Sequence, residues 1–136
     1  MSYQTQDLAP KGSTGTGTFV ANGLADANVV AVEFEVEAVG STPTVTFQVE
    51  GALHRAAGKA DTDVADASDQ WDKVALVTAD STVAATSAAV TKTGTGKYIY
   101  FVAGLDLRAF RKIRLNVSAN TNVTFSARLH RNDVSK

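Results

Sequence analysis

The chain has 136 residues, 13 basic and 14 acidic side chains, a net charge of −1 and no cysteine. The length predicts one domain, and a domain of this size hides roughly two-thirds of its unfolded surface, so a core can form without cross-links. The missing cysteines exclude disulfides, thiolate catalysis and cysteine-based metal sites, and they favour folding inside a cell. No stretch is long and apolar enough to span a bilayer, and residues 1–10 lack a signal-peptide core, so no membrane partner is expected.

The N-terminal segment predicts an extended arm. Gly12, Gly15 and Gly17 alternate with serine and threonine and show no apolar period, which is typical of a flexible segment. A phosphate-binding loop would need a strand before the glycines and a helix after them, and neither pattern is present. We therefore expect residues 1–17 to form an N-terminal arm and residues 18–136 to form a single β-sandwich domain.

Residues 30–51 show the clearest periodic pattern. Apolar side chains alternate with glutamates as far as Ala38, and the alternation resumes at Val45 after the break Gly40-Ser41-Thr42-Pro43. A period of two places successive side chains on opposite faces of a strand. A break rich in turn formers, with a proline that cannot donate to a ladder, lies outside the paired region. The pattern predicts an antiparallel hairpin with one apolar face and one charged face.

The middle of the chain combines an acidic loop with short predicted strands. Five aspartates lie between Asp61 and Asp72, and calcium sites use several carboxylate oxygens. The spacing is not that of an EF-hand loop, so a solvated acidic loop is the preferred interpretation. Strands are expected at 18–21, 71–77, 83–91 and 98–102, with Trp71 as a core residue and a helical turn at 107–109.

The last predicted strand pair, at residues 112–131, repeats the first. The alternation from Ile113 to Ala119 matches that from Val32 to Ala38, and Val123-Thr124-Phe125 matches Val45-Thr46-Phe47. Two similar hairpins at the two ends of a chain are typical of a β-sandwich. We predict an all-β fold, an antiparallel β-sandwich or jelly-roll-like structure of about eight strands, with an extended N-terminal arm. The expected inward-facing aromatic residues are Phe34, Phe47 and Phe125.

The small net charge hides a division between the two parts of the chain. Residues 1–80 carry four basic and twelve acidic groups, a net −8, and residues 81–136 carry nine basic and two acidic groups, a net +7. We prefer mutual neutralisation, within one molecule or between neighbours, to binding of a polyanion by the basic part. The charged residues of the two predicted hairpins are candidate assembly contacts: Glu33, Glu35, Glu37, Glu50, Arg111, Arg114, Arg128 and Arg131.

No catalytic signature is present. His54 and His130 have no carboxylate or histidine partner at metal-ligand spacing in the sequence, so both are interpreted as surface residues. No serine lies in a strand-turn-helix nucleophile elbow. The stretch 108–114 interleaves basic residues with a phenylalanine, as nucleic-acid binders do, but the whole chain is not basic. We therefore expect no enzyme activity, no cofactor, no metal site and no nucleic-acid partner.

The pattern of the whole chain resembles the small β-rich structural proteins of tailed bacteriophages. The segments that carry the resemblance are Val32–Gly51, with its Gly-Ser-Thr-Pro break, Phe110–Val117 and Asn122–Ala127. A tryptophan after the next loop, here Trp71, is also frequent in that class. The resemblance implies a virion protein of the capsid-decoration or minor capsid type, without enzymatic activity. Such a protein binds the major capsid protein lattice and itself, commonly as a homotrimer, and stabilises the shell.

Two other functions fit the same sequence. A phage tail-tube or tail-tip component shares the β-sandwich and the arm. A carbohydrate-binding jelly-roll module is the second alternative, because Phe110–Leu115 resembles the aromatic and basic final-strand region of galactose-binding-like jelly rolls. The aromatic residues that could contact a sugar are Tyr3, Trp71, Tyr98 and Tyr100.

Overall fold

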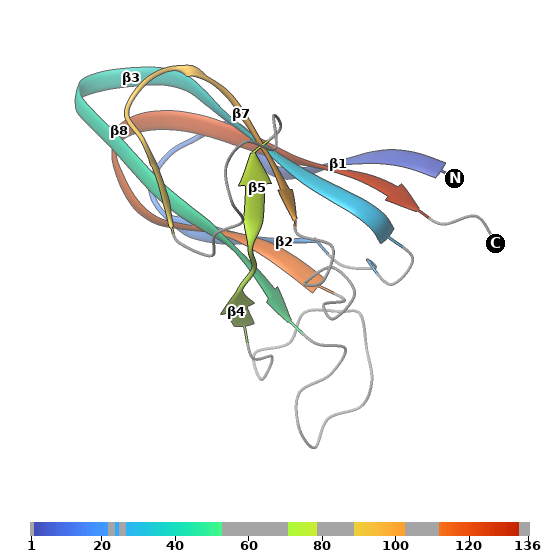
Figure 1. Ribbon diagram of the computed structural model, residues 1–136. Coiled ribbons are helices and arrows are strands. Elements are labelled where there is room, and N and C mark those ends of the chain that lie inside the picture. Colours follow the sequence, from blue (N-terminus) through green and yellow to red (C-terminus); the bar gives the residue numbers. More distant parts are fainter. Residues whose placement is uncertain are drawn as a thin grey trace.

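The computed structural model describes residues 2–21, 24, 27–52, 71–78, 89–102 and 112–133, which form eight strands in one antiparallel sheet (Figure 1). The strands are β1 (Ser2–Ser13), β2 (Gly17–Ala21), β3 (Ala27–Ala52), β4 (Trp71–Lys73), β5 (Leu76–Thr78), β6 (Val90–Lys92), β7 (Gly96–Val102) and β8 (Lys112–Asp133). The prediction of an all-β antiparallel fold with about eight strands is confirmed. The described residues include no helix that could span a membrane, and the helical turn expected at 107–109 lies outside them.

The two longest strands, β3 and β8, pair antiparallel along nearly their whole lengths. The first part of β3 pairs with the last part of β8, from Ala27 opposite Asp133 to Val39 opposite Val123. The last part of β3 pairs with the first part of β8, ending with Ala52 opposite Lys112. Between these parts the register shifts, and both strands bend at the same end of the molecule (Figure 1).

The alternating segments do form strands, but the prediction that neighbouring segments pair with each other as hairpins is wrong. Residues 30–39 and 44–52 do not pair with each other, because both segments pair with β8. The break at 40–43 carries β3 through a bend and does not start a hairpin. Alternation indicates which face of a strand is apolar, but it does not indicate which neighbour completes the backbone hydrogen bonds.

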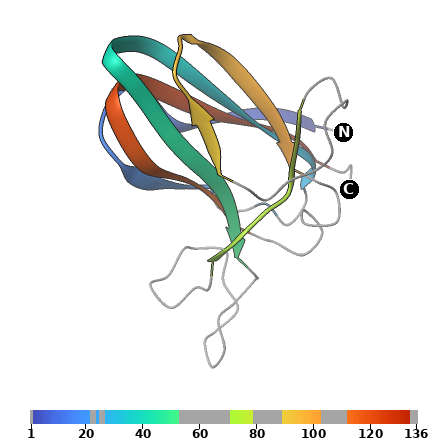
Figure 2. The same ribbon diagram turned by 60° about the vertical axis from the view of Figure 1, so that its left-hand side comes forward.

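The bend folds the sheet into two facing layers, which Figure 2 shows from a second direction. The first layer contains β1, the last part of β8, the first part of β3, β7 and β5. The second layer contains β2, the first part of β8, the last part of β3, β4 and β6. The chain crosses between the layers several times, and the crossings within β3, within β8, and between β1 and β2 lie together at the bend.

Two asparagines of β8 tie these crossings together. Asn120 Nδ2 donates a hydrogen bond to the Gly15 carbonyl at 2.9 Å, and Asn122 Nδ2 donates to the Ser41 carbonyl at 2.6 Å. Asn122 has φ 53°, in the left-handed region that asparagine enters more readily than most residues. A Cβ at Gly40 would lie 3.1 Å from the Asn122 Cβ, so a glycine there lets β3 and β8 approach closely.

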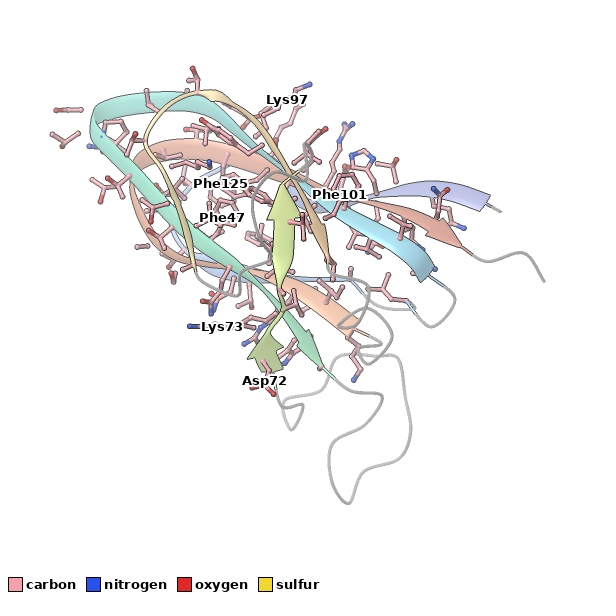
Figure 3. All side chains as sticks on the ribbon, viewed as in Figure 1. Phe47, Asp72, Lys73, Lys97, Phe101 and Phe125 are labelled. Atoms are coloured by element: carbon pink, nitrogen blue, oxygen red, sulfur yellow. The ribbon has the colours of Figure 1, made fainter. Side chains whose placement is uncertain are left out.

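The core lies between the two layers and is built around three phenylalanines. The Phe34 ring stacks on Phe47 with centroids 4.1 Å apart and on Phe125 with centroids 5.3 Å apart. All three side chains are fully buried, and Figure 3 places Phe47 and Phe125 in the interior (Figure 3). Contacts between stacked aromatic rings add to the stabilisation from burial alone. The prediction that these three residues face inward is confirmed.

The N-terminal segment is part of the sheet. Ser2–Asp7 pairs in regular register with β8, and Leu8 and Ala9 are buried in the core. The prediction of an arm without a buried face is therefore wrong for Ser2–Ser13. Register shifts on both sides of Ala9 break the period of two, so two adjacent residues face the core and no alternation marks the strand. The short strand expected at 18–21 is confirmed as part of β2.

Replacing Phe34 by alanine tests the stacked core. Its ring contacts one phenylalanine in each layer, so we expect the free energy of unfolding to fall by about 3–5 kcal/mol. Ile99→Ala is the control, because this side chain is 42% exposed and surface substitutions usually change stability by no more than about 0.5 kcal/mol. Urea unfolding curves of the two variants measure the difference, and equal shifts would contradict the assignment of Phe34 to the core.

Candidate interaction surface

Cross-strand rows of side chains cover the face of the first layer that points away from the core, called here the outer face. The strand pairings place residues side by side across the layer. Three rows follow, read from β1 toward β5: Thr5, His130, Ala31, Phe101 and Val77; Asp7, Arg128, Glu33 and Ile99; Ser126, Glu35 and Lys97. Residues from five strands that are separate in the sequence thus form one surface.

The glutamates of β3 have cationic neighbours on this face. Lys11 Nζ lies 3.7 Å from Glu35 Oε2 and 3.7 Å from Glu37 Oε1, and Lys97 Nζ lies 3.7 Å from Glu35 Oε1. The Gly12 N–H also donates to Glu37 Oε2 at 2.9 Å. Both lysines are mostly exposed, so each ion pair contributes only about 0–1 kcal/mol to folding. Their main effect is to neutralise the acidic strand locally.

His130 lies between a hydroxyl and a carboxylate. Its Nδ1 is 3.3 Å from Thr5 Oγ1 and its Nε2 is 3.7 Å from Glu33 Oε1. The sequence shows no carboxylate at metal-ligand spacing from this histidine, but the fold places Glu33 beside it. The sequence separates Glu33 from His130, and only the register of β3 against β8 brings the two side chains together. The remaining basic group of the rows, Arg128, contacts Asp7 with its Nε 3.3 Å from Oδ1.

The second layer carries a different cluster around Arg114. Arg114 Nε donates to Glu50 Oε1 at 2.6 Å, and Gln48 Nε2 donates to Glu50 Oε2 at 2.6 Å. The guanidinium lies over the Trp71 ring, 4.5 Å from its centroid, in the geometry of a cation–π contact. The Glu50 side chain is only 9% exposed. Trp71 was predicted to be a core residue, but it is half-buried beneath Arg114. The single strand expected at 71–77 is instead divided into β4 and β5.

The structure separates the candidate assembly residues into groups. Three glutamates and Arg128 share the outer face, whereas Glu50 and Arg114 form a pair within the second layer. Arg131 is half-buried near the end of β8, and Arg111 lies outside the described residues. The interpretation that acidic and basic strands neutralise each other within one molecule is confirmed for Glu50 with Arg114. The role of these residues as assembly contacts stays a prediction.

The metal hypothesis concerns residues that are mostly outside the described part of the chain. Asp72 is exposed on β4, but the other four aspartates of the acidic loop and His54 are not described. Among the described residues, no group of three or more acidic or histidine side chains could hold a metal ion.

Exposed apolar side chains on the outer face are the feature that sequence reasoning missed. Ile99 is 42% exposed, Val29 41% and Phe101 36%. They lie beside Ala31 and the half-buried Val77, and these five residues are called here the apolar strip. The signal was present in the sequence, since residues 98–102 are apolar or aromatic at every position and so have no polar face. Contiguous exposed apolar groups often mark interaction sites.

Two open hollows border these features. One of about 450 Å³ lies at the bend and is lined by Val39, Gly40 and both bend asparagines among others. The other, of about 330 Å³, lies between Lys11 and Lys97 above the glutamates that pair with them. The asparagines of the first hollow and the charged groups of the second already bond within the chain, so the wider outer face is a better candidate for a functional surface than either hollow.

The fold and its outer face define an all-β protein whose accessible chemistry is a mixed charged and apolar sheet face. No protein-family model and no curated protein matches the chain. Among solved structures the chain is similar to the crystal structure of SPBc2 prophage-derived protein YomS, with a TM-score of 0.61 and 9% sequence identity. The match covers 96% of this chain and 94% of that chain. At this identity the likeness shows a shared fold.

Substituting the two arginines should show that the Arg114–Glu50 pair stabilises the fold more than the exposed Arg128–Asp7 pair does. Arg114→Ala leaves the nearly buried Glu50 without its cation, so we expect a loss of about 3 kcal/mol, at the low end for a broken buried pair because Arg114 is partly exposed. Arg128→Ala removes a solvent-exposed pair, so we expect a loss of about 0–1 kcal/mol. Thermal and urea unfolding measure both. Equal losses of unfolding free energy in the two variants would show that Glu50 does not depend on Arg114 to balance its charge.

Proposed function

We propose that the protein is a non-enzymatic structural protein of a tailed-bacteriophage virion. In this proposal it is a decoration or minor capsid protein that binds the major capsid protein lattice and stabilises the shell, and it also associates with itself. The observation that carries the proposal is the fold shared with a prophage-derived protein over nearly the full length of both chains. The sequence resemblance to small β-rich phage proteins supports the same class.

The architecture suits repeated protein contacts. A folded sheet with a stacked aromatic core and a tied bend holds its outer face in one shape. Surfaces that are ordered before binding lose less entropy when they bind. Many described charges on this face have partners in the same chain, so a protein partner need not supply a full set of opposite charges. An apolar strip beside these pairs provides the area that drives association.

The surroundings of His130 support a role without catalysis. A hydroxyl, an imidazole and a carboxylate in a row could in principle relay a proton. Acyl transfer also needs N–H donors aimed at the developing oxyanion. The backbone of β8 around His130 is paired with β1 on one side and with β3 on the other, so its N–H groups are already used by the sheet.

The contacts of three of the four candidate aromatic residues disfavour a carbohydrate-binding module, and the side chain of the fourth, Tyr3, lies outside the described part of the structure. Tyr100 is buried, the Tyr98 hydroxyl donates to the Gly94 carbonyl at 3.0 Å, and Trp71 stacks against Arg114. Sugar-binding sites present aromatic rings with a free face, and these three rings pack within the chain. The fold similarity and the sequence resemblance support a phage tail component as well as they support a capsid protein. The experiment below distinguishes these two proposals.

Electron microscopy of native particles tests the proposed location. We expect density for the protein on the outer surface of the head, and particles that lack the protein should release their DNA at a lower temperature than complete particles. Adding the purified protein back should restore this stability, and a Phe34→Ala variant serves as an unstable control. Density for the protein on the tail alone would contradict the capsid proposal and support a tail component. If the protein is absent from the particles, both proposals are wrong.

A further inference from the structure

We propose that the outer face of the first layer is a self-association surface, on which the apolar strip packs against the same strip of a second copy of this chain. This inference concerns contact between copies and does not depend on a phage function.

The position of the strip provides the first argument. Phe101 lies at its centre, between Ala31 of β3 and Val77 of β5, and Ile99 lies in the next row beside Glu33. Both β7 side chains point away from the core, because their neighbours Tyr98 and Tyr100 point into it. Figure 3 shows Lys97, on the same side of β7, projecting away from the interior. Interface centres are typically aromatic and aliphatic with charged residues around them.

The charge of the outer face provides the second argument. The groups beside the strip are four carboxylates, three cations and one histidine: Asp7, Glu33, Glu35, Glu37, Lys11, Lys97, Arg128 and His130. Their signs alternate across the strands, and the sum is close to zero. Two-fold pairing brings a surface against itself, so a strongly charged face would repel its copy. A nearly neutral face with mixed signs is compatible with a second copy and has little attraction for a polyanion.

The size of the face provides the third argument. Five strands with a spacing of about 4.8 Å span about 20 Å, and the steps from Ala27 to Glu37 span about 33 Å at about 3.3 Å each. Because β5 and β7 are shorter than this part of β3, the area is about 600 Å², at the lower end of one partner's share of a standard protein interface. The face is therefore large enough for a stable dimer.

The edge of β1 that faces away from β8, beyond which no further described strand lies, is a poorer contact between copies. Register shifts interrupt β1 between Asp7 and Ser13, and Pro10 has no N–H to donate. Bulges and prolines on an edge strand hinder the addition of another strand. This arrangement favours contact through the face of the sheet over extension of the sheet at β1.

Sedimentation velocity over a range of protein concentrations tests the proposal. We expect the wild-type chain to form a dimer, and we expect Ile99→Lys and Phe101→Lys each to weaken the dimer about 100-fold, tenfold for each of the two copies. Val39→Lys is the matched control, because Val39 is 40% exposed but lies at the bend, outside the outer face. It should sediment as wild type does. Circular dichroism of every variant should match the wild type, because the substituted side chains lie on the surface.

Several outcomes would overturn the proposal. A wild-type chain that stays monomeric at all concentrations, or a dimer that Ile99→Lys and Phe101→Lys leave intact, would remove the strip from the contact between copies. A trimer would contradict two-fold pairing of this face. If both lysine variants dimerise normally but bind particles poorly, the strip faces the shell and the occupant proposed here is wrong.

Discussion

The pairing of β3 with β8 is the interaction on which the rest of the structure depends. The strands β1 and β2 pair with β8, the strands β4, β6 and β7 pair with β3, and β5 joins through β7. Because both central strands bend together, each contributes to both layers, and Phe34 of one layer meets Phe47 of the other. The same register places Glu33 opposite Arg128 and Glu50 opposite Arg114. One pairing thus sets the core and places acidic side chains of β3 beside basic side chains of β8.

The sequence predicted the strands and their faces better than their partners. Period-two alternation identified the buried phenylalanines, because burial is a property of one strand and its own side chains. The pairing of Glu50 with Arg114 depends on residues far apart in the sequence, and local patterns do not encode such contacts. Ser2–Ser13 escaped detection as a strand because its buried residues, Leu8 and Ala9, are adjacent. The candidate charges were found, but the exposed apolar strip beside them was not.

The two layers use their outward side chains differently. In the second layer Glu50 accepts hydrogen bonds from Arg114 and Gln48, and Trp71 covers the guanidinium, so this cluster stabilises the fold. In the first layer the ion pairs are exposed and contribute little to folding, and they surround the apolar strip. Stability is thus concentrated in the core and the second layer, and the first layer is left to present a surface. This division fits the binding role proposed for the protein.

Backbone nuclear Overhauser contacts between labelled strands test the central claim most directly. We expect contacts between residues 30–39 and 123–131, and between residues 44–52 and 112–121, because the register of β3 against β8 requires them. Contacts between residues 30–39 and 44–52 in the pattern of an antiparallel hairpin would contradict the bent-strand pairing. The outer face, its rows of charges and its apolar strip would then lose their structural basis.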